Sequence, residues 1–237
     1  METKLLSDHA EDLLKAAELL RNGAVVGMPT ETVYGLAADA RNPEAVRQIF
    51  AAKGRPADNP LIVHIAEMRA LEQVAATVPP LAEKLAERFW PGPLTMILPK
   101  RKEIPEITSG GLDTVGIRMP SHPVARALIQ LSGVPIAAPS ANISGYPSPT
   151  TAQHVMRDMQ GKIAAVVDGG ACSVGVESTV IALEPNGTVR ILRPGFVTKE
   201  MLEEVAPEVT LDPAILHQLQ EGQTVRSPGM KYQHYSP

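Results

Sequence analysis

The amino-acid sequence predicts an α/β domain built on a mixed β-sheet. Helical and strand-like segments alternate through most of the chain, which is typical of strands connected by helices. Residues 178–183 and 188–192 are two β-rich runs separated by a turn containing Asn186-Gly187, and this is the pattern of an antiparallel hairpin. Parallel and antiparallel pairing are therefore both expected in one sheet.

The composition fits an ordinary globular protein. Of its 237 residues, 44% are hydrophobic and 20% are charged, which allows one substantial core. The net charge of −4 argues against a protein whose main task is to hold nucleic acid, although a local basic pocket remains compatible with it. One cysteine, Cys172, excludes an intramolecular disulfide, and no signal peptide or membrane span is evident. We therefore expect a cytoplasmic protein.

The elements follow from caps and apolar runs. Asp8 and Glu11 resemble a capping box, and the helix that they start is expected to stop at Gly23. Asn42-Pro43 is a cap and first-turn pair for a second helix that ends near Gly54. Further helices are expected at residues 80–89, 123–131 and 151–159. Strands are expected at residues 24–28, 61–65, 94–98, 114–118, 135–138, 163–168, 178–183 and 188–192.

Familiar nucleotide and metal signatures are missing from the sequence. It has no G-x-x-x-x-G-K-[ST] loop, no G-x-G-x-x-G turn after a strand, and no His/Cys spacing typical of zinc. Any ATP site is therefore built in another way, and no protein metal site is expected. Cys172 is either one half of a Cys-His pair or, as the sequence favours, a small buried residue.

Several polar segments follow or begin apolar strands, where open α/β sheets bind ligands. Residues 29–36 (PTETVYGL) place two threonines and a carboxylate after a strand, either to meet a polar substrate or to cap the next element. Lys53 and Arg55 suit an anion, or else simply a helix C-terminus. His64 lies among apolar residues, so it either faces a site or belongs to the core.

Two further strands end in charged or small residues. Arg118 closes an apolar strand, so it needs an anionic ligand or a buried salt bridge. Residues 137–145 (AAPSANISG) let the backbone approach a ligand closely. Ser178 and Arg193 each lie at the edge of a strand. Without an evident nucleophile–base pair, this pattern indicates binding of several anionic groups and catalysis by positioning and charge stabilisation.

Seven motifs, in this order, resemble the YrdC-like family of threonylcarbamoyl-AMP synthases. They are PTETVYGL at 29–36, KGR at 53–55 with NPL at 59–61, PGPLT at 91–95, GIRMP at 116–120, PSANISG at 139–145, ESTV at 177–180 and RPG at 193–195. The resemblance runs from about residue 8 to 205. It implies a twisted mixed sheet with flanking helices around a concave, positively charged cavity.

The resemblance also implies residue roles. L-threonine would be held by Thr32, His64, Arg118, Ala138 and Ser178. ATP would be held by Arg55, Asn59, Thr114, Ser140, Asn142, Ser148, Arg193 and Tyr232. Lys53 and Arg55 would neutralise developing charge as the catalytic residues. Arg118 would pair with the threonine carboxylate.

Residues 1–210 are expected to form the YrdC-like catalytic domain, and residues 211–237 a C-terminal helix and a linker that acts as a lid. In longer members of the family this linker leads to a second domain. Here the chain stops at the linker, either as a truncated form or as a natural form without that domain.

The implied reaction joins L-threonine, bicarbonate and ATP into threonylcarbamoyl-AMP and pyrophosphate, for threonylcarbamoyladenosine modification of tRNA. Mg²⁺ would be bound mainly through ATP phosphates, and a threonylcarbamoyl transferase complex would act downstream. Neither stable nucleic-acid binding nor a membrane is expected. The main alternative is a tRNA- or dsRNA-binding module on the same fold; carbamoyl transfer in hydrogenase maturation and nucleotide sensing are further alternatives.

Overall fold

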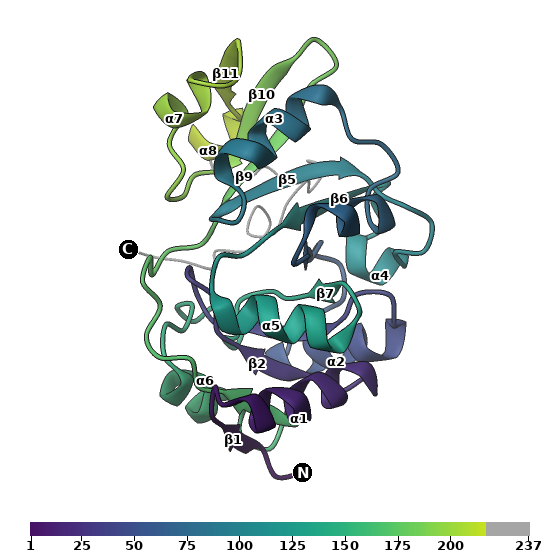
Figure 1. Cartoon of the computed structure of the whole chain (residues 1–237), viewed down its shortest axis with the longest axis vertical. Coiled ribbons are helices and arrows are strands. Elements are labelled where there is room, and N and C mark those ends of the chain that lie inside the picture. Colours follow the sequence, from purple (N-terminus) through teal and green to yellow (C-terminus); the bar gives the residue numbers. More distant parts are fainter. Residues whose placement is uncertain (217–237) are drawn as a thin grey trace.

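The structure is a computed structural model and describes residues 1–216 (Figure 1). The strands are β1 (Lys4–Leu6), β2 (Val26–Met28), β3 (Gly35–Asp39), β4 (Ile62–His64), β5 (Leu94–Pro99), β6 (Thr114–Arg118), β7 (Ile136–Ala137), β8 (Ala165–Val167), β9 (Thr179–Leu183), β10 (Thr188–Arg193) and β11 (Glu208–Leu211). The helices are α1 (Ala10–Arg21), α2 (Pro43–Lys53), the 3₁₀ helix η1 (Met68–Gln73), α3 (Pro80–Phe89), α4 (Glu106–Ser109), α5 (Pro123–Ser132), α6 (Ala152–Met159), α7 (Lys199–Glu203) and α8 (Pro213–Leu216).

The described strands join into one mixed sheet with the order β1-β8-β2-β3-β7-β4-β6-β5-β9-β10-β11. Pairing is parallel for β4 with β6 and for β5 with β9, and antiparallel for β5 with β6 and for β9 with β10. The mixed α/β sheet and the hairpin around Asn186-Gly187 are thus confirmed. Figure 1 shows α1 and α5 side by side in the half with β2, and α3 in the half with β5, β9 and β10.

The cap signals of the second helix are confirmed. The Asn42 side chain accepts hydrogen bonds from the backbone N–H groups of Glu44 and Ala45, and Pro43 stands in the first turn. Gly54 ends the helix in the left-handed conformation, with φ of 69°, which glycine adopts without a steric penalty. This turn separates Lys53 from Arg55 and sends their side chains to different places.

The expected capping box was wrong. Asp8 and Glu11 do not form a capping box, because His9 is the N-cap residue and makes no side-chain cap bond. The Asp12 carboxylate instead accepts from Ser7, at 2.8 Å from both its backbone nitrogen and its hydroxyl.

Three strands, β1, β3 and β11, were not predicted from the sequence, and β3 is the one next to residues 29–34. Its residues, Gly-Leu-Ala-Ala-Asp, include no β-branched or aromatic side chain. Because β3 pairs antiparallel with β2, residues 29–34 form the connection between two paired strands.

The core is aliphatic, and the largest buried cluster spans β-strands and helices from Val25 to Val209. Alanines such as Ala16 and Ala137 are fully buried, which lets helices and strands pack closely. No helix within residues 1–216 is long and apolar enough to cross a membrane.

Candidate active site

A cavity of about 520 Å³, its opening to solvent included, lies where several strands begin or end. It is lined by Thr30, Thr32, Val33, Gly35, Arg55, Ile62, His64, Arg118, Ala138, Pro139, Ser140, Glu177, Ser178 and Arg193. His64, Arg118 and Arg193 are the last residues of β4, β6 and β10, and Ser178 directly precedes β9. The fold therefore gathers strand ends that lie far apart in the sequence.

Most of the predicted site residues meet in this cavity. Eight of them line it, namely Thr32, Arg55, His64, Arg118, Ala138, Ser140, Ser178 and Arg193. Five do not line it, namely Lys53, Asn59, Thr114, Asn142 and Ser148. Tyr232 and most of the predicted lid segment lie outside the described residues.

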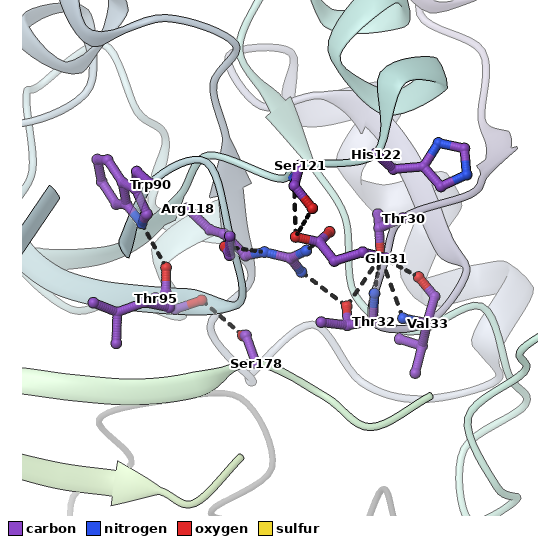
Figure 2. Close-up of polar contacts among 12 residues, drawn as sticks. Thr30, Glu31, Thr32, Val33, Trp90, Thr95, Arg118, Ser121, His122 and Ser178 are labelled. Atoms are coloured by element: carbon purple, nitrogen blue, oxygen red, sulfur yellow. Dashed lines mark hydrogen bonds and ion pairs between the residues drawn. The ribbon is translucent and has the colours of Figure 1, made fainter. Parts of the chain in front are cut away.

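Thr30 organises the loop between β2 and β3. Its hydroxyl accepts hydrogen bonds from the backbone N–H groups of Thr32 and Val33, both at 3.2 Å, and donates to the Val33 carbonyl at 2.6 Å. The hydroxyls of Thr30 and Thr32 are 3.0 Å apart (Figure 2). Both threonines are buried, so the hydroxyls shape the cavity wall rather than a solvated turn.

Arg118 forms a buried salt bridge with Glu31, one of the two alternatives that the sequence left open. Its guanidinium also donates to the Thr32 hydroxyl at 2.9 Å and to the Gly92 carbonyl at 3.3 Å. Burial acts to raise the pKa of Glu31, but the Arg118 charge and two hydrogen bonds from Ser121 outweigh it and lower that pKa below its ordinary value. Glu31 is therefore ionised at neutral pH.

His64 lines the cavity and is also almost fully buried, so both sequence interpretations describe it in part. Burial, and then the nearby charge of Arg118, lowers the pKa of His64 to about 3. The imidazole is therefore neutral at physiological pH. It gives the cavity a polar ring without a further positive charge.

Lys53 lies behind the cavity wall and is fully buried. Its ammonium donates to the backbone carbonyl of Ser140, to the carbonyl of Asn142 at 2.8 Å and to the Asn142 side-chain oxygen at 3.5 Å. Three oxygens match the three N–H bonds of an ammonium group. These contacts hold the 140–142 loop, while Arg55 on the other side of Gly54 lines the cavity; contact of Lys53 with phosphate or bicarbonate remains a prediction.

Another part of the cavity wall is formed by Glu177, Ser178 and Arg193. Arg193 donates to the Ser178 carbonyl at 2.9 Å and to its hydroxyl at 3.1 Å, and it pairs with Glu177 at 3.0 Å. The close approach requires Gly195, because a Cβ there would lie 2.6 Å from the Glu177 carbonyl oxygen. The RPG motif thus brings Arg193 against the start of β9.

Of the remaining predicted residues, Ser148 and Asn142 support the wall from behind, whereas Asn59 and Thr114 stand apart from it. Ser148 donates to Glu177 at 3.1 Å, and Asn142 uses its amide nitrogen on backbone carbonyls of its own loop. Asn59 is fully buried, and Thr114 begins β6.

Sequence analysis assigned no role to Glu177, and it assigned Thr30 and Glu31 only the two alternatives of meeting a polar substrate or capping the next element. The expectation that Arg118 needs an anionic ligand or a buried salt bridge is met by Glu31, which the sequence did not single out as its partner.

The cavity offers three arginines, a neutral imidazole, hydroxyls and a small apolar surface, which suit a ligand with several anionic groups. Cys172 is no activated nucleophile, since burial raises the pKa of its thiol to about 11. Within residues 1–216 no three His, Cys, Asp or Glu side chains gather as metal ligands. Glu177, the carboxylate of the lining, is bonded to Arg193 and Ser148, and Mg²⁺ bound through ATP phosphates remains a prediction.

Comparison with known proteins identifies relatives along the whole chain. A family model of Sua5, YciO and YrdC proteins, described as telomere recombination, matches residues 18–195, and a model described as threonylcarbamoyl-AMP synthase, C-terminal domain, matches residues 197–237. The threonylcarbamoyl-AMP synthase of Pyrococcus abyssi is 54% identical over 222 residues, covering 94% of this chain and 64% of that protein. That of Bacillus subtilis is 52% identical over 237 residues, covering 99% of this chain and 67% of that protein. This chain thus spans about two thirds of the length of these relatives.

Solved structures agree with the fold. The crystal structure of P. abyssi Sua5 complexed with L-threonine matches with a TM-score of 0.93 at 50% identity, over 100% of this chain and 69% of that one. Escherichia coli YciO matches with a TM-score of 0.73 over 82% of this chain and 96% of that one, and at 22% identity it supports the fold alone. The chain therefore belongs to the family of Sua5, YciO and YrdC proteins, whose model covers residues 18–195.

Proposed function

We propose that this protein forms threonylcarbamoyl-AMP and pyrophosphate from L-threonine, bicarbonate and ATP, as a step in the modification of tRNA. The observation that carries the proposal is the meeting of eight predicted substrate residues in one cavity. Relatives at 54% and 52% identity carry the name threonylcarbamoyl-AMP synthase, and a related protein with a matching fold binds L-threonine.

The threonine end of the cavity is formed by Thr32, His64, Arg118, Ala138 and Ser178. Arg118 donates to the substrate carboxylate, and the hydroxyl groups accept from or donate to the polar groups of the amino acid. Because His64 is neutral, it does not repel the substrate ammonium group. The apolar surface of Ile62 and Ala138 suits a methyl group.

The triphosphate end is formed by Arg55, Ser140 and Arg193, and the supporting residues Asn142 and Ser148 lie behind them. The threonine ammonium group loses a proton to bicarbonate or solvent, and the free amine then attacks bicarbonate and forms a carbamate with loss of water. A carbamate oxygen then attacks the α-phosphorus of ATP, and the bond to the leaving pyrophosphate breaks. The arginines stabilise the charge that develops during this transfer, and Mg²⁺ bound mainly through the phosphates would supply further screening.

The test measures pyrophosphate release from ATP while each substrate is omitted in turn. We expect release only when L-threonine and bicarbonate are both present. Serine lacks one methyl group, worth about 1–3 kcal/mol in a fitted pocket, so its turnover should be low but measurable. Salt-sensitive tRNA binding without ATP consumption would instead favour a nucleic-acid module, and release without threonine would contradict the proposal.

A further inference from the structure

The salt bridge between Glu31 and Arg118 is deeply buried, with side-chain exposures of 7% and 4%. A buried pair of this kind is costly to desolvate and is weak evidence for stability by itself. Its position beside the cavity gives another reason for it. Arg118 lines the cavity, whereas Glu31 does not.

The carboxylate of Glu31 is held from two sides, as Figure 2 shows. One oxygen accepts from Arg118. The other accepts from the backbone nitrogen of Ser121 at 2.9 Å and from its hydroxyl at 2.8 Å. Since Ser121 follows β6 by only three residues, the strand that carries Arg118 also holds the carboxylate that orients it.

The guanidinium is fixed in place and still has capacity for a ligand. Its bonds to Glu31, Thr32 and Gly92 use three of its five N–H donors. A ligand in the cavity reaches Arg118 without passing Glu31, because the carboxylate stands outside the lining. Glu31 therefore need not be displaced when a substrate carboxylate arrives.

We propose that Glu31 is a positioning residue that fixes the Arg118 guanidinium for the carboxylate of the amino-acid substrate. The inference rests on the proposed function, since that function makes the amino-acid carboxylate the partner of Arg118. An alternative role for Glu31 predicts the opposite change in amino-acid affinity. If Glu31 merely competed with the substrate for Arg118, removal of its charge would strengthen amino-acid binding.

The experiment compares Glu31→Gln, which keeps the shape and removes the charge, with Glu31→Asp, which keeps the charge on a shorter stem. L-threonine affinity is measured by calorimetry without ATP, and KM for each substrate is measured by pyrophosphate release. We expect threonine affinity to fall about tenfold or more in Glu31→Gln, the fold-change of one charge-assisted hydrogen bond, with the KM for ATP within about twofold. Glu31→Asp should recover part of the loss.

A double variant covers the case in which Glu31→Gln fails to fold. Removal of both charges leaves no uncompensated buried ion, so Glu31→Gln combined with Arg118→Met should fold better than Glu31→Gln alone. If Glu31 acts through Arg118, the double variant binds threonine as weakly as Arg118→Met.

Equal or tighter threonine binding by Glu31→Gln, or a further loss in the double variant, would overturn the inference. Wild-type protein that binds no threonine would instead show that the proposed function fails.

Discussion

Lys53→Met tests whether the buried lysine holds the cavity wall or contacts a substrate. The Lys53 ammonium is fully buried and bonds two backbone carbonyls and one amide oxygen of residues 140–142. Each buried acceptor left without a partner costs about 1–3 kcal/mol, and relief from burying a charge offsets part of the sum. We therefore expect a net loss of about 2–4 kcal/mol, which in a chain of this size lowers Tm by roughly 4–16 °C.

The assay is thermal and urea unfolding of the ligand-free protein, followed by KM for threonine and for ATP. Lys100→Met is the matched control, because Lys100 donates to one carbonyl, that of Ile104, at 2.7 Å and lies outside the cavity lining. The control should lose only about 1 kcal/mol and keep both KM values. If Lys53→Met is as stable as the wild type and only its KM for ATP rises, Lys53 is a phosphate ligand and the reasoning is refuted.

Two further predictions concern His64 and Gly195. Because the pKa of His64 is about 3 in the fold and about 6.5 when unfolded, the unfolded chain binds more protons below pH 6.5, and stability is lost as the pH falls from there towards 3. Urea unfolding should thus show a loss of about 2 kcal/mol between pH 7.5 and 5 that His64→Gln lacks; identical pH slopes would mean that His64 titrates normally. Gly195→Ala should push the RPG loop from Ser178, since the new Cβ would lie 2.6 Å from backbone atoms, and cost about 1–3 kcal/mol with weaker ATP binding. Unchanged Tm and ATP affinity would show that the loop gives way without consequence.

The sequence predicted much of the fold because local chemistry agreed with the tertiary structure there. The capping side chain of Asn42 and the proline after it mark a helix start in any context, and Thr151 likewise caps α6. Asn186-Gly187 determined a hairpin. Local signals can also mislead, as at Asp8, whose expected capping role is replaced by another local contact, from Ser7 to the Asp12 carboxylate.

The sequence predicted which residues belong to the site better than it predicted which of them line the cavity and which lie behind it. Motif order placed Arg55, Arg118 and Ser178 in one cavity. Arg118 and Ser178 meet there because strand ends gather at one edge of a sheet, whereas Arg55 follows α2. Spacing alone cannot tell which of Lys53 and Arg55 faces the cavity, since the left-handed Gly54 between them determines both directions. The pairing of Glu31 with Arg118 was not predicted, because the two residues lie 87 positions apart in the chain.

We propose that the hollow formed by distant loops holds an amino acid beside a triphosphate. A crystal structure with L-threonine and a non-hydrolysable ATP analogue tests it most directly. We expect the threonine carboxylate within hydrogen-bond distance of Arg118 and the phosphates against Arg55 and Arg193. Threonine bound elsewhere, or phosphates on a surface remote from these arginines, would contradict the claim.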